Sequence, residues 1–391
     1  MTRLRYLTAG ESHGPQLTAI LEGCPAGLPL TAADIDRDLR RRQLGAGRGA
    51  RMAIERDQVT LAGGVRYGRT TGAPIALVVA NRDAANWLGV LDVELPAEPA
   101  DPVRVPRPGH ADLGGALLYG HADLRDVIER ASARETAARV AVGAVARRLL
   151  GEAGCSIASH VVAIGGQQAD RSVLVAQLAS DRWPETADAD PVRCLDAAAA
   201  TRMQAAIGAA AEHGDTLGGI FEVIVAGCPA GLGSYSQADR RLGSHLAAAV
   251  MSIPAIKGVE IGGGFALADA PGSEVHDEII WSAEDGYRHA TNRAGGVEGG
   301  MSTGEHIVVR AAMKPIATLR SPLRSVELGT HASVVSRFEH SDVCAVPAAA
   351  VVAEAVVALA LAGAMLERFG GASLAELLDA VTAAGRRTRD A

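Results

Sequence analysis

Short apolar runs near the start of the chain predict strands at Leu17–Leu21, Gln58–Leu61 and Ile75–Val79. A helix is predicted between the first two runs, from about Ala32 to Gln43. Thr31 directly precedes it and is a residue type that commonly caps helix N-termini. The first part of the chain therefore mixes strands with a short helix.

Two longer segments rich in alanine and valine predict helices at Ala133–Leu150 and Ala348–Phe369. Both are apolar around most of their circumference, so each must be covered on more than one side. The stretch Val346–Leu366 is long enough to cross a membrane, but Glu354 interrupts it and Pro347 opens it. Because alanine dominates there rather than leucine, a buried helix is favoured over a membrane span.

Two segments predict exposed, irregular excursions from the core. The first, Leu88–Pro106, is rich in proline and acidic residues and is expected to be a loop. The second, Gln167–Asp190, is polar and irregular in pattern and is expected to behave in the same way.

The chain repeats itself in two halves. Gly23–Leu28 (GCPAGL) recurs unchanged as Gly227–Leu232, and Ala62–Val65 (AGGV) recurs as Ala294–Val297. The two matches occur in the same order, and each half ends in one of the long helices. We interpret this pattern as an internal duplication.

The repeated unit covers about residues 4–150 and again 210–370, and consists of a strand, a turn, a short helix, a hairpin and a long helix. The economical way to cover two apolar helices is an α+β fold with a central helix layer between two mostly antiparallel sheets. Since the halves would then share one core, we expect a single domain over residues 1–391.

Composition narrows the class of protein. The net charge of −7 argues against a general nucleic-acid surface. The five cysteines are scattered without a C-x-x-C pair, which indicates neither a metal site nor a disulfide framework and fits a reducing cytoplasm. The N-terminus lacks the apolar segment of a signal peptide. We therefore expect a cytoplasmic protein with no metal and no nucleic-acid or membrane partner.

A candidate anion site lies where the helix at Ala133–Leu150 begins. Ser132 and Glu135 have the spacing of a capping box, and a helix N-terminus offers free N–H groups and a positive dipole end. Arg130 and Arg134 add positive charge there. A well-capped core helix flanked by surface arginines explains the same residues, so the helix alone leaves both interpretations open.

A second basic region contains seven arginines between Arg37 and Arg56, interspersed with glycines. This basic region is equally compatible with a binding site for a phosphate or nucleotide and with a helix end exposed to solvent. The series Gly45-x-Gly47-x-x-Ala50 resembles a dinucleotide fingerprint, but it follows a helix instead of a strand, so the Rossmann context is missing.

Five motifs, in order along the chain, closely resemble those of the chorismate synthase family. They are Gly10–Gly14 (GESHG), Arg107–Asp112 (RPGHAD), Ala131–Thr136 (ASARET), Asn292–Gly300 (NRAGGVEGG) and Met313–Ile316 (MKPI). The resemblance runs from about Leu4 to Gly371 and is highly specific. It implies a β-α-β sandwich assembled as a homotetramer.

The resemblance also implies a reaction, the conversion of 5-enolpyruvylshikimate 3-phosphate into chorismate by 1,4-elimination of phosphate. The family requires reduced FMN (FMNH2) although the reaction has no net redox change. NADPH is implied as an indirect reductant, and reduction by the enzyme itself or by a separate flavin reductase both remain open. Substrate and cofactor carry phosphate, so many arginines in an otherwise acidic protein fit this chemistry.

The catalytic residues implied by the resemblance are His13, His110 and Asp342. His13 would protonate the departing phosphate, and His110 would protonate the reduced flavin. Histidine is suited to donating a proton near neutral pH. Asp342 would assist the flavin as it accepts the substrate proton.

The resemblance also implies the residues that bind the cofactors. The flavin contacts would be Arg130, Ala131, Ser132, Pro254, Ala255, Gly299, Lys314, Pro315, Ile316, Ala317 and Thr318. Arg42 and Arg48 match positions assigned to a nicotinamide nucleotide or another anionic edge. In many relatives an arginine just before the aspartate motif contacts the flavin. This chain has His340 at that position and Arg337 three residues upstream. Both residues are candidates for the contact.

Two other classes of function are compatible with parts of this pattern. A flavin- or nucleotide-dependent oxidoreductase would consume a hydride donor with each product formed. A phosphosugar- or nucleotide-binding module would bind its ligand without releasing phosphate. The paired histidines in glycine-flanked turns, together with Asp342, favour an enzyme.

Overall fold

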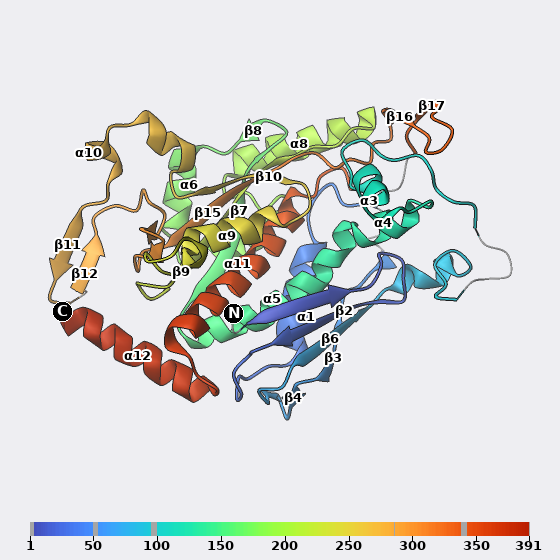
Figure 1. The fold of residues 1–391 in the computed structure, drawn as a ribbon. Coiled ribbons are helices and arrows are strands. Elements are labelled where there is room, and N and C mark those ends of the chain that lie inside the picture. Colours follow the sequence, from blue (N-terminus) through green and yellow to red (C-terminus); the bar gives the residue numbers. More distant parts are fainter. Residues whose placement is uncertain (1–3, 50–53, 95–99, 285, 338–341, 391) are drawn as a thin grey trace.

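A computed structural model of the chain describes residues 4–49, 54–94, 100–284, 286–337 and 342–390. The N-terminal half forms a four-stranded antiparallel sheet in the order β1-β2-β6-β3 (Figure 1). Its strands are β1 (Arg5–Ala9), β2 (Gln16–Glu22), β6 (Ile75–Ala80) and β3 (Val59–Gly63). The three predicted strands are thus confirmed. Ile75, Leu77 and Val79 alternate along β6 and are buried, so one face of this sheet faces the core.

The C-terminal half supplies a five-stranded antiparallel sheet in the order β10-β15-β9-β7-β8. Its strands are β10 (Ile256–Ile261), β15 (Ile307–Met313), β9 (Gly219–Ala226), β7 (Ser156–Ile164) and β8 (Gln167–Gln168). Four short hairpins lie outside the two sheets: β4 (Val65–Arg66) with β5 (Arg69–Thr70), β11 (Ile279–Ser282) with β12 (Gly286–His289), β13 (Val297–Glu298) with β14 (Met301–Ser302), and β16 (Arg324–Val326) with β17 (Ser333–Val335).

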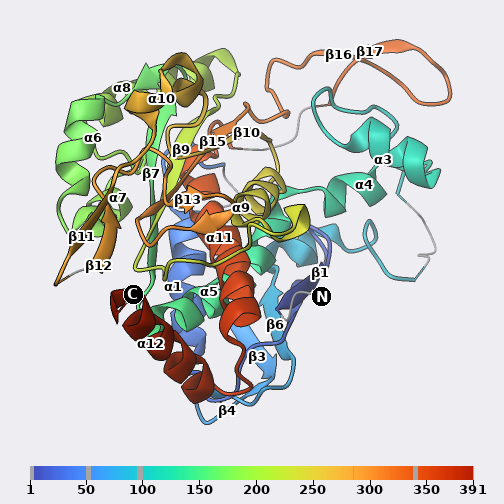
Figure 2. The same cartoon turned by 60° about the vertical axis from the view of Figure 1, so that its left-hand side comes forward.

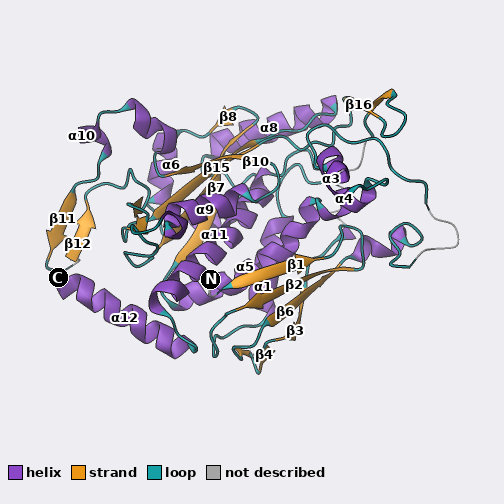
Figure 3. Cartoon of the chain, in the orientation of Figure 1, coloured by secondary structure: helices purple, strands orange, loops and turns teal. Residues whose placement is uncertain are grey.

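Helices α5 (Thr136–Glu152) and α11 (Val346–Phe369) lie between the two sheets, and other helices lie around them (Figure 3). The α-helices are α1 (Ala32–Gln43), α3 (Asp112–Tyr119), α4 (Arg125–Arg130), α5 (Thr136–Glu152), α6 (Arg171–Leu178), α7 (Trp183–Ala189), α8 (Ala197–His213), α9 (Leu242–Met251), α10 (Gly272–Val275), α11 (Val346–Phe369) and α12 (Leu374–Asp390). Short 3-10 turns are η1 (Arg82–Trp87), η2 (Ala133–Glu135), η3 (Ala238–Arg240) and η4 (Gly264–Asp269). α5 packs on β2 and β6, α11 packs on β7 and β9, and the two helices pack against each other (Figure 2). The α+β class and the helix layer between two antiparallel sheets agree with the prediction.

The strand orders of the two sheets correspond, as an internal duplication would require. β1-β2-β6-β3 in the first sheet matches β7-β9-β15-β10 in the second. The counterpart of β1 is β7 (Ser156–Ile164), so the second repeat begins earlier than the predicted residue 210. The hydroxyl of Thr70 donates to Pro25 O at 2.6 Å, and at the matching place Ser302 donates to Pro229 O at 2.7 Å. Thr70 thus joins the first GCPAGL turn to the β4–β5 hairpin, and Ser302 joins the second GCPAGL turn to the β13–β14 hairpin. The two halves therefore share this side-chain hydrogen bond as well.

Helix α11 is buried along most of its length, as predicted. Among the described helices it alone has the length and apolar composition of a membrane span, and 94% of its most apolar window is buried inside the protein. Glu354, in the middle of the helix, is 1% exposed and pairs with Arg41 at 2.6 Å and Arg147 at 2.8 Å. Burial alone would raise the pKa of Glu354, but the guanidinium groups of Arg41 and Arg147 outweigh it and lower the pKa to about 2.

The segment Gln167–Asp190 departs from the prediction, because it contains two short helices, α6 and α7, instead of an irregular loop. The carboxylate of Asp170 accepts a hydrogen bond from the N–H of Ser172 and caps α6. Leu174 and Ala187 are buried in a small separate cluster. Caps and a few apolar contacts stabilise helices too short to show a clear period. The loop predicted at Leu88–Pro106 contains neither helix nor strand in its described residues, as expected.

A close approach of α5 and α11 requires glycine at position 143. A methyl group built on Gly143 would lie 2.3 Å from Cβ of Ala355, far inside van der Waals contact. We expect Gly143→Ala to lower the free energy of unfolding by about 1–2 kcal/mol, because so short a contact puts overpacking at the upper end of its usual cost, about 2–3 kcal/mol, against roughly 1 kcal/mol gained in helix propensity. Chemical denaturation checks this, with Gly208→Ala in α8 as the control, since nothing lies within 4 Å of a methyl group there. Equal stability of Gly143→Ala and wild type would contradict this packing.

Candidate active site

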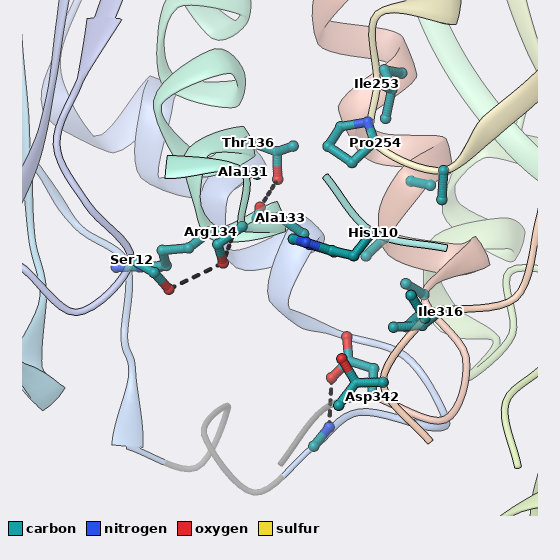
Figure 4. A pocket seen from close by; sticks show the side chains of 18 of the residues that line it. Ser12, His110, Ala131, Ala133, Arg134, Thr136, Ile253, Pro254, Ile316 and Asp342 are labelled. Carbon is teal, nitrogen blue, oxygen red and sulfur yellow. Dashed lines mark hydrogen bonds between the residues drawn. The ribbon is translucent and has the colours of Figure 1, made fainter. Parts of the chain in front are cut away.

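A cavity of about 300 Å³ opens at the ends of the central helices (Figure 4). One wall is the turn that begins α5, from Ala131 to Thr136. The opposite wall is formed by Ile253–Ala255 and by Met313–Thr318, and these two segments are joined by a hydrogen bond from Lys314 N to Ala255 O at 2.9 Å. Segments distant in the sequence thus converge on one space.

His13 lies in this cavity and is held by a buried carboxylate. Its Nδ1 is 2.8 Å from Oε1 of Glu129, and its backbone N–H donates to Oε2 of the same residue at 2.8 Å. Glu129 is 4% exposed. The imidazole also stacks on Trp87, with ring centroids 4.0 Å apart. Glu129 therefore fixes the ring orientation, and Nε2 is the nitrogen available for proton transfer.

His110 is held in the same way from the other side of the cavity. Its Nδ1 lies 2.5 Å from Oδ1 of Asp112, whose side chain is fully buried. Arg107 donates to the same carboxylate at 2.8 Å. Burial alone would raise the pKa of Asp112, but hydrogen bonds from His110 and Arg107 outweigh it and hold the pKa well below its usual range. Asp112 therefore stays ionised beside Nδ1 of His110, which Arg107 Nη2 also approaches to 3.0 Å.

Four arginines line the cavity: Arg42, Arg48, Arg107 and Arg134. Arg48 donates to Oδ2 of Asp342 at 2.5 Å, and the N–H of Gly49 donates to the other carboxylate oxygen at 2.6 Å. Asp342 therefore closes one end of the cavity while bound to the loop that follows α1. Several guanidinium groups in one partly enclosed space are suited to phosphate and carboxylate groups.

The predicted capping box at the start of α5 is only half correct. Ser132 accepts a hydrogen bond from Arg134 N, so it does cap the turn η2. The carboxylate of Glu135, however, accepts from Thr8 and pairs with Arg139 instead of returning to Ser132. The hydroxyl of Ser132 also donates to Ser12 at 3.0 Å and joins the two turns. Tertiary partners outcompete the local cap.

The cavity brings together most of the residues predicted for the site. Those that line it are His13, Arg42, Arg48, His110, Ala131, Ser132, Pro254, Ala255, Lys314, Pro315, Ile316, Ala317, Thr318 and Asp342. Lys314 donates to Gly109 O at 2.5 Å and thereby connects its segment to the His110 turn. Pro254, Pro315 and Ile316 form an apolar wall facing the polar one.

Two predicted residues in the described part of the chain are not brought to this cavity. Arg130 lies in an adjoining hollow and donates to Thr8 O at 2.8 Å and Gly10 O at 3.1 Å, which are backbone acceptors. Gly299 lies in the turn between β13 and β14 and is not among the lining residues. His340 falls outside the described residues, and Arg337 is exposed on the segment before it.

The structure adds site residues that the sequence did not single out. Glu129 and Asp112 bind the histidines, Ser12 binds Ser132, and Thr136 accepts a hydrogen bond from Arg42. Asp112 and Thr136 are the last residues of two motifs named above, so the sequence marks them as candidate site residues. Glu129 is 116 residues from His13 in sequence, and nothing local marks the pair.

The geometry fits a class of enzyme, because a partly enclosed cavity with four arginines, a lysine and two histidines is suited to binding a compact polyanion and to transferring protons. Among the described residues, no three His, Cys, Asp or Glu side chains gather in a way that would hold a metal ion. The positive charge facing a ligand comes instead from arginine and lysine.

Comparison with known proteins identifies the family to which this enzyme belongs. The sequence model of the chorismate synthase family matches residues 4–366. Chorismate synthase of Bacillus cytotoxicus is 56% identical over 372 residues, covering 94% of this chain and 95% of the relative. Chorismate synthase of Geobacillus thermodenitrificans is 57% identical over 370 residues, with the same coverage. A crystal structure of chorismate synthase has a TM-score of 0.80 and 41% identity, covering 99% of each chain.

The chain belongs to the chorismate synthase family. It is therefore a carbon–oxygen lyase, and its reaction is the anti-1,4-elimination of phosphate from 5-enolpyruvylshikimate 3-phosphate to give chorismate.

Proposed function

We propose that this cavity binds 5-enolpyruvylshikimate 3-phosphate beside reduced FMN, and that His13, His110 and Asp342 carry the proton transfers. One observation supports the proposal most. Two histidines, each bound through Nδ1 to a buried carboxylate, open on one cavity with four arginines and a lysine. That arrangement provides proton donors and anion-binding groups in the same space.

The substrate has a phosphate and two carboxylates, and the arginines are the groups that would bind them. Arg42, Arg48 and Arg134 come from α1, the loop after it and the start of α5, so they approach from different directions. Arginine's planar fork can donate two parallel hydrogen bonds to a phosphate or a carboxylate. The backbone N–H groups at the start of α5 add positive partial charge.

His13 is assigned as the acid that protonates the leaving phosphate. With Nδ1 bound to Glu129, the imidazolium presents its Nε2–H for donation. The carboxylate stabilises the charged ring and keeps it from rotating. His110, bound to Asp112, is assigned the corresponding role on the flavin side of the cavity.

The residues present fit a flavin. An apolar wall formed by Pro254, Pro315 and Ile316 suits one face of a flat ring system, and Lys314 supplies a cation at its edge. Reduced FMN, when bound, supplies an electron that is later returned and accepts the proton leaving the substrate. We also propose NADPH as the indirect source of reducing equivalents, acting with or without a separate flavin reductase.

We further propose a homotetramer in the cytoplasm. Apolar side chains that a monomer would leave exposed support assembly: Trp281 and Tyr287 on the β11–β12 hairpin are 59% and 54% exposed, and Leu7 on β1 is 75% exposed. The cysteines, which are unpaired and buried, support a reducing compartment.

The deciding experiment is anaerobic incubation with dithionite-reduced FMN and 5-enolpyruvylshikimate 3-phosphate, following chorismate absorbance and released phosphate together. The proposal expects many turnovers for each flavin without further reductant. Product formation that stops after one equivalent of reduced flavin, or that consumes hydride stoichiometrically, would instead indicate an oxidoreductase. Binding without phosphate release would indicate a binding module.

Lys314 provides a separate test of the flavin assignment. We expect Lys314→Ala to weaken FMN binding roughly tenfold to a hundredfold, because a charge-assisted hydrogen bond typically contributes about 1.5–3 kcal/mol. Titration of FMN in the presence of substrate measures this. Lys257→Ala is the matched control, since Lys257 lies outside the cavity lining. An unchanged affinity in Lys314→Ala would mean that its bond to Gly109 is purely structural.

A further inference from the structure

Beneath the cavity, one fully buried carboxylate joins two of the arginines that line it. Asp57 is 1% exposed and lies just before β3. Its Oδ2 accepts from Arg42 Nη1 at 3.3 Å, and its Oδ1 accepts from Arg134 Nη1 at 2.5 Å. The arginines belong to α1 and η2, so this single side chain bridges two elements far apart in sequence.

Other contacts hold the remaining edges of both guanidinium groups. Arg42 donates from Nε to the hydroxyl of Thr136 at 2.9 Å and from Nη2 to Ala133 O at 3.0 Å. Arg134 donates from Nε to Oδ1 of Asn81 at 2.8 Å. Each fork therefore has little rotational freedom left, and its direction depends on these partners.

Arg134 keeps one nitrogen for which no protein hydrogen bond is found within the described residues. That nitrogen, Nη2, is buried, and its nearest carboxylate oxygen, on Glu55, is 3.6 Å away. A buried N–H group without a hydrogen bond is costly. The ion pair with Glu55, itself 1% exposed, therefore holds this side of Arg134.

Electrostatics explain why a carboxylate is needed between the two arginines. Burial lowers the pKa of Arg42 to about 10. The negative charge of Asp57 raises this pKa, and the positive charges of Arg48 and Arg134 lower it. Two guanidinium groups in one buried space repel each other. With the charge of Asp57 removed, that repulsion is expected to spread them apart.

We propose that Asp57 is a positioning residue that sets the spacing and direction of Arg42 and Arg134, so that together they bind one phosphate or carboxylate group of the substrate. The inference rests on the proposed function of the cavity, and it adds a residue that does not itself line the cavity. It acts through the two arginines without touching the ligand.

The test compares Asp57→Asn with Glu354→Gln. Both substitutions remove the charge of a buried carboxylate bound to arginines of α1, but Glu354 binds Arg41, which is not among the residues lining the cavity. For Asp57→Asn we expect the Kd of inorganic phosphate, measured by calorimetry, and the KM of the substrate to rise about tenfold to a hundredfold. The fall in kcat is expected to be smaller than the rise in KM. Glu354→Gln is expected to lose stability while phosphate affinity stays within about twofold of wild type.

Wild-type phosphate affinity in Asp57→Asn, or equal weakening in both variants, would overturn the proposal. If Asp57→Asn does not fold, Asp57→Glu decides, because it keeps the charge but lengthens the side chain by one methylene group and so shifts the carboxylate relative to Arg42 and Arg134. About threefold to tenfold weaker phosphate binding is then expected, and unchanged binding would refute the positioning role. Because calorimetry needs no turnover, a failure of the proposed reaction would leave this measurement interpretable.

Discussion

Replacing either His13 or His110 with alanine is expected to lower kcat by about 10²–10⁴-fold, the usual contribution of a positioned acid or base. Each ring is bound through Nδ1 to a buried carboxylate, Glu129 or Asp112, so its Nε2 is held in a fixed position. The decrease should persist in single turnovers with pre-reduced FMN, because the loss lies in proton transfer and not in flavin supply.

A control separates catalysis from a general loss of structure. His213 is exposed at the end of α8, and its imidazole Nδ1 lies 2.7 Å from Ala209 O of the same helix. Its backbone carbonyl accepts from Ser321, a contact that alanine keeps. His213→Ala is expected to retain wild-type kcat, and all three variants should keep melting temperatures close to one another. If His13→Ala or His110→Ala turned over at the wild-type rate with confirmed flavin occupancy, that histidine would have no part in the mechanism.

The parts of the fold that could be predicted are those with a local signal. Helix α1 is predicted to the residue, since Thr31 marks its start and Gln43 precedes a glycine-rich turn. The apolar circumference of α11 requires cover on all sides, and the structure supplies it from both halves. The short helices α6 and α7 escape prediction because eight and seven residues are too few to establish a period.

The residues of the candidate site likewise fall into those that a sequence motif marks and those that only folding brings together. The turns containing His13 and His110 carry motifs, so their residues can be selected from the order of amino acids alone. Glu129 and Asp57 cannot, because Glu129 lies 116 residues from His13 and Asp57 lies 77 residues from Arg134, so only folding brings each pair together. Arg130, directly before the Ala131–Thr136 motif, donates to backbone acceptors in the adjoining hollow, and its flavin contact stays a prediction.

Asp342→Asn is expected to reduce product formation about a hundredfold while FMN and substrate still bind. Its place in the sequence would equally allow Asp342 to cap the helix that begins near Pro347. The structure excludes that function, because the N-cap residue of α11 is Ala345 and no side chain caps it. Asp342 instead accepts from Arg48 and from the N–H of Gly49.

Asparagine at this position keeps one acceptor for the Gly49 N–H but loses the charge that holds Arg48 and the ability to take up a proton. The loop after α1 should therefore remain in place while the proton-accepting end of the cavity fails. Asp188→Asn is the matched control, because Asp188 also accepts from an arginine, Arg41, at 2.8 Å but lies outside the cavity lining. Melting temperature and single-turnover rate, measured on the same preparations with pre-reduced FMN, separate the two effects. A normal rate in Asp342→Asn would make Asp342 a structural partner of Arg48, and His340 would become the next residue to test.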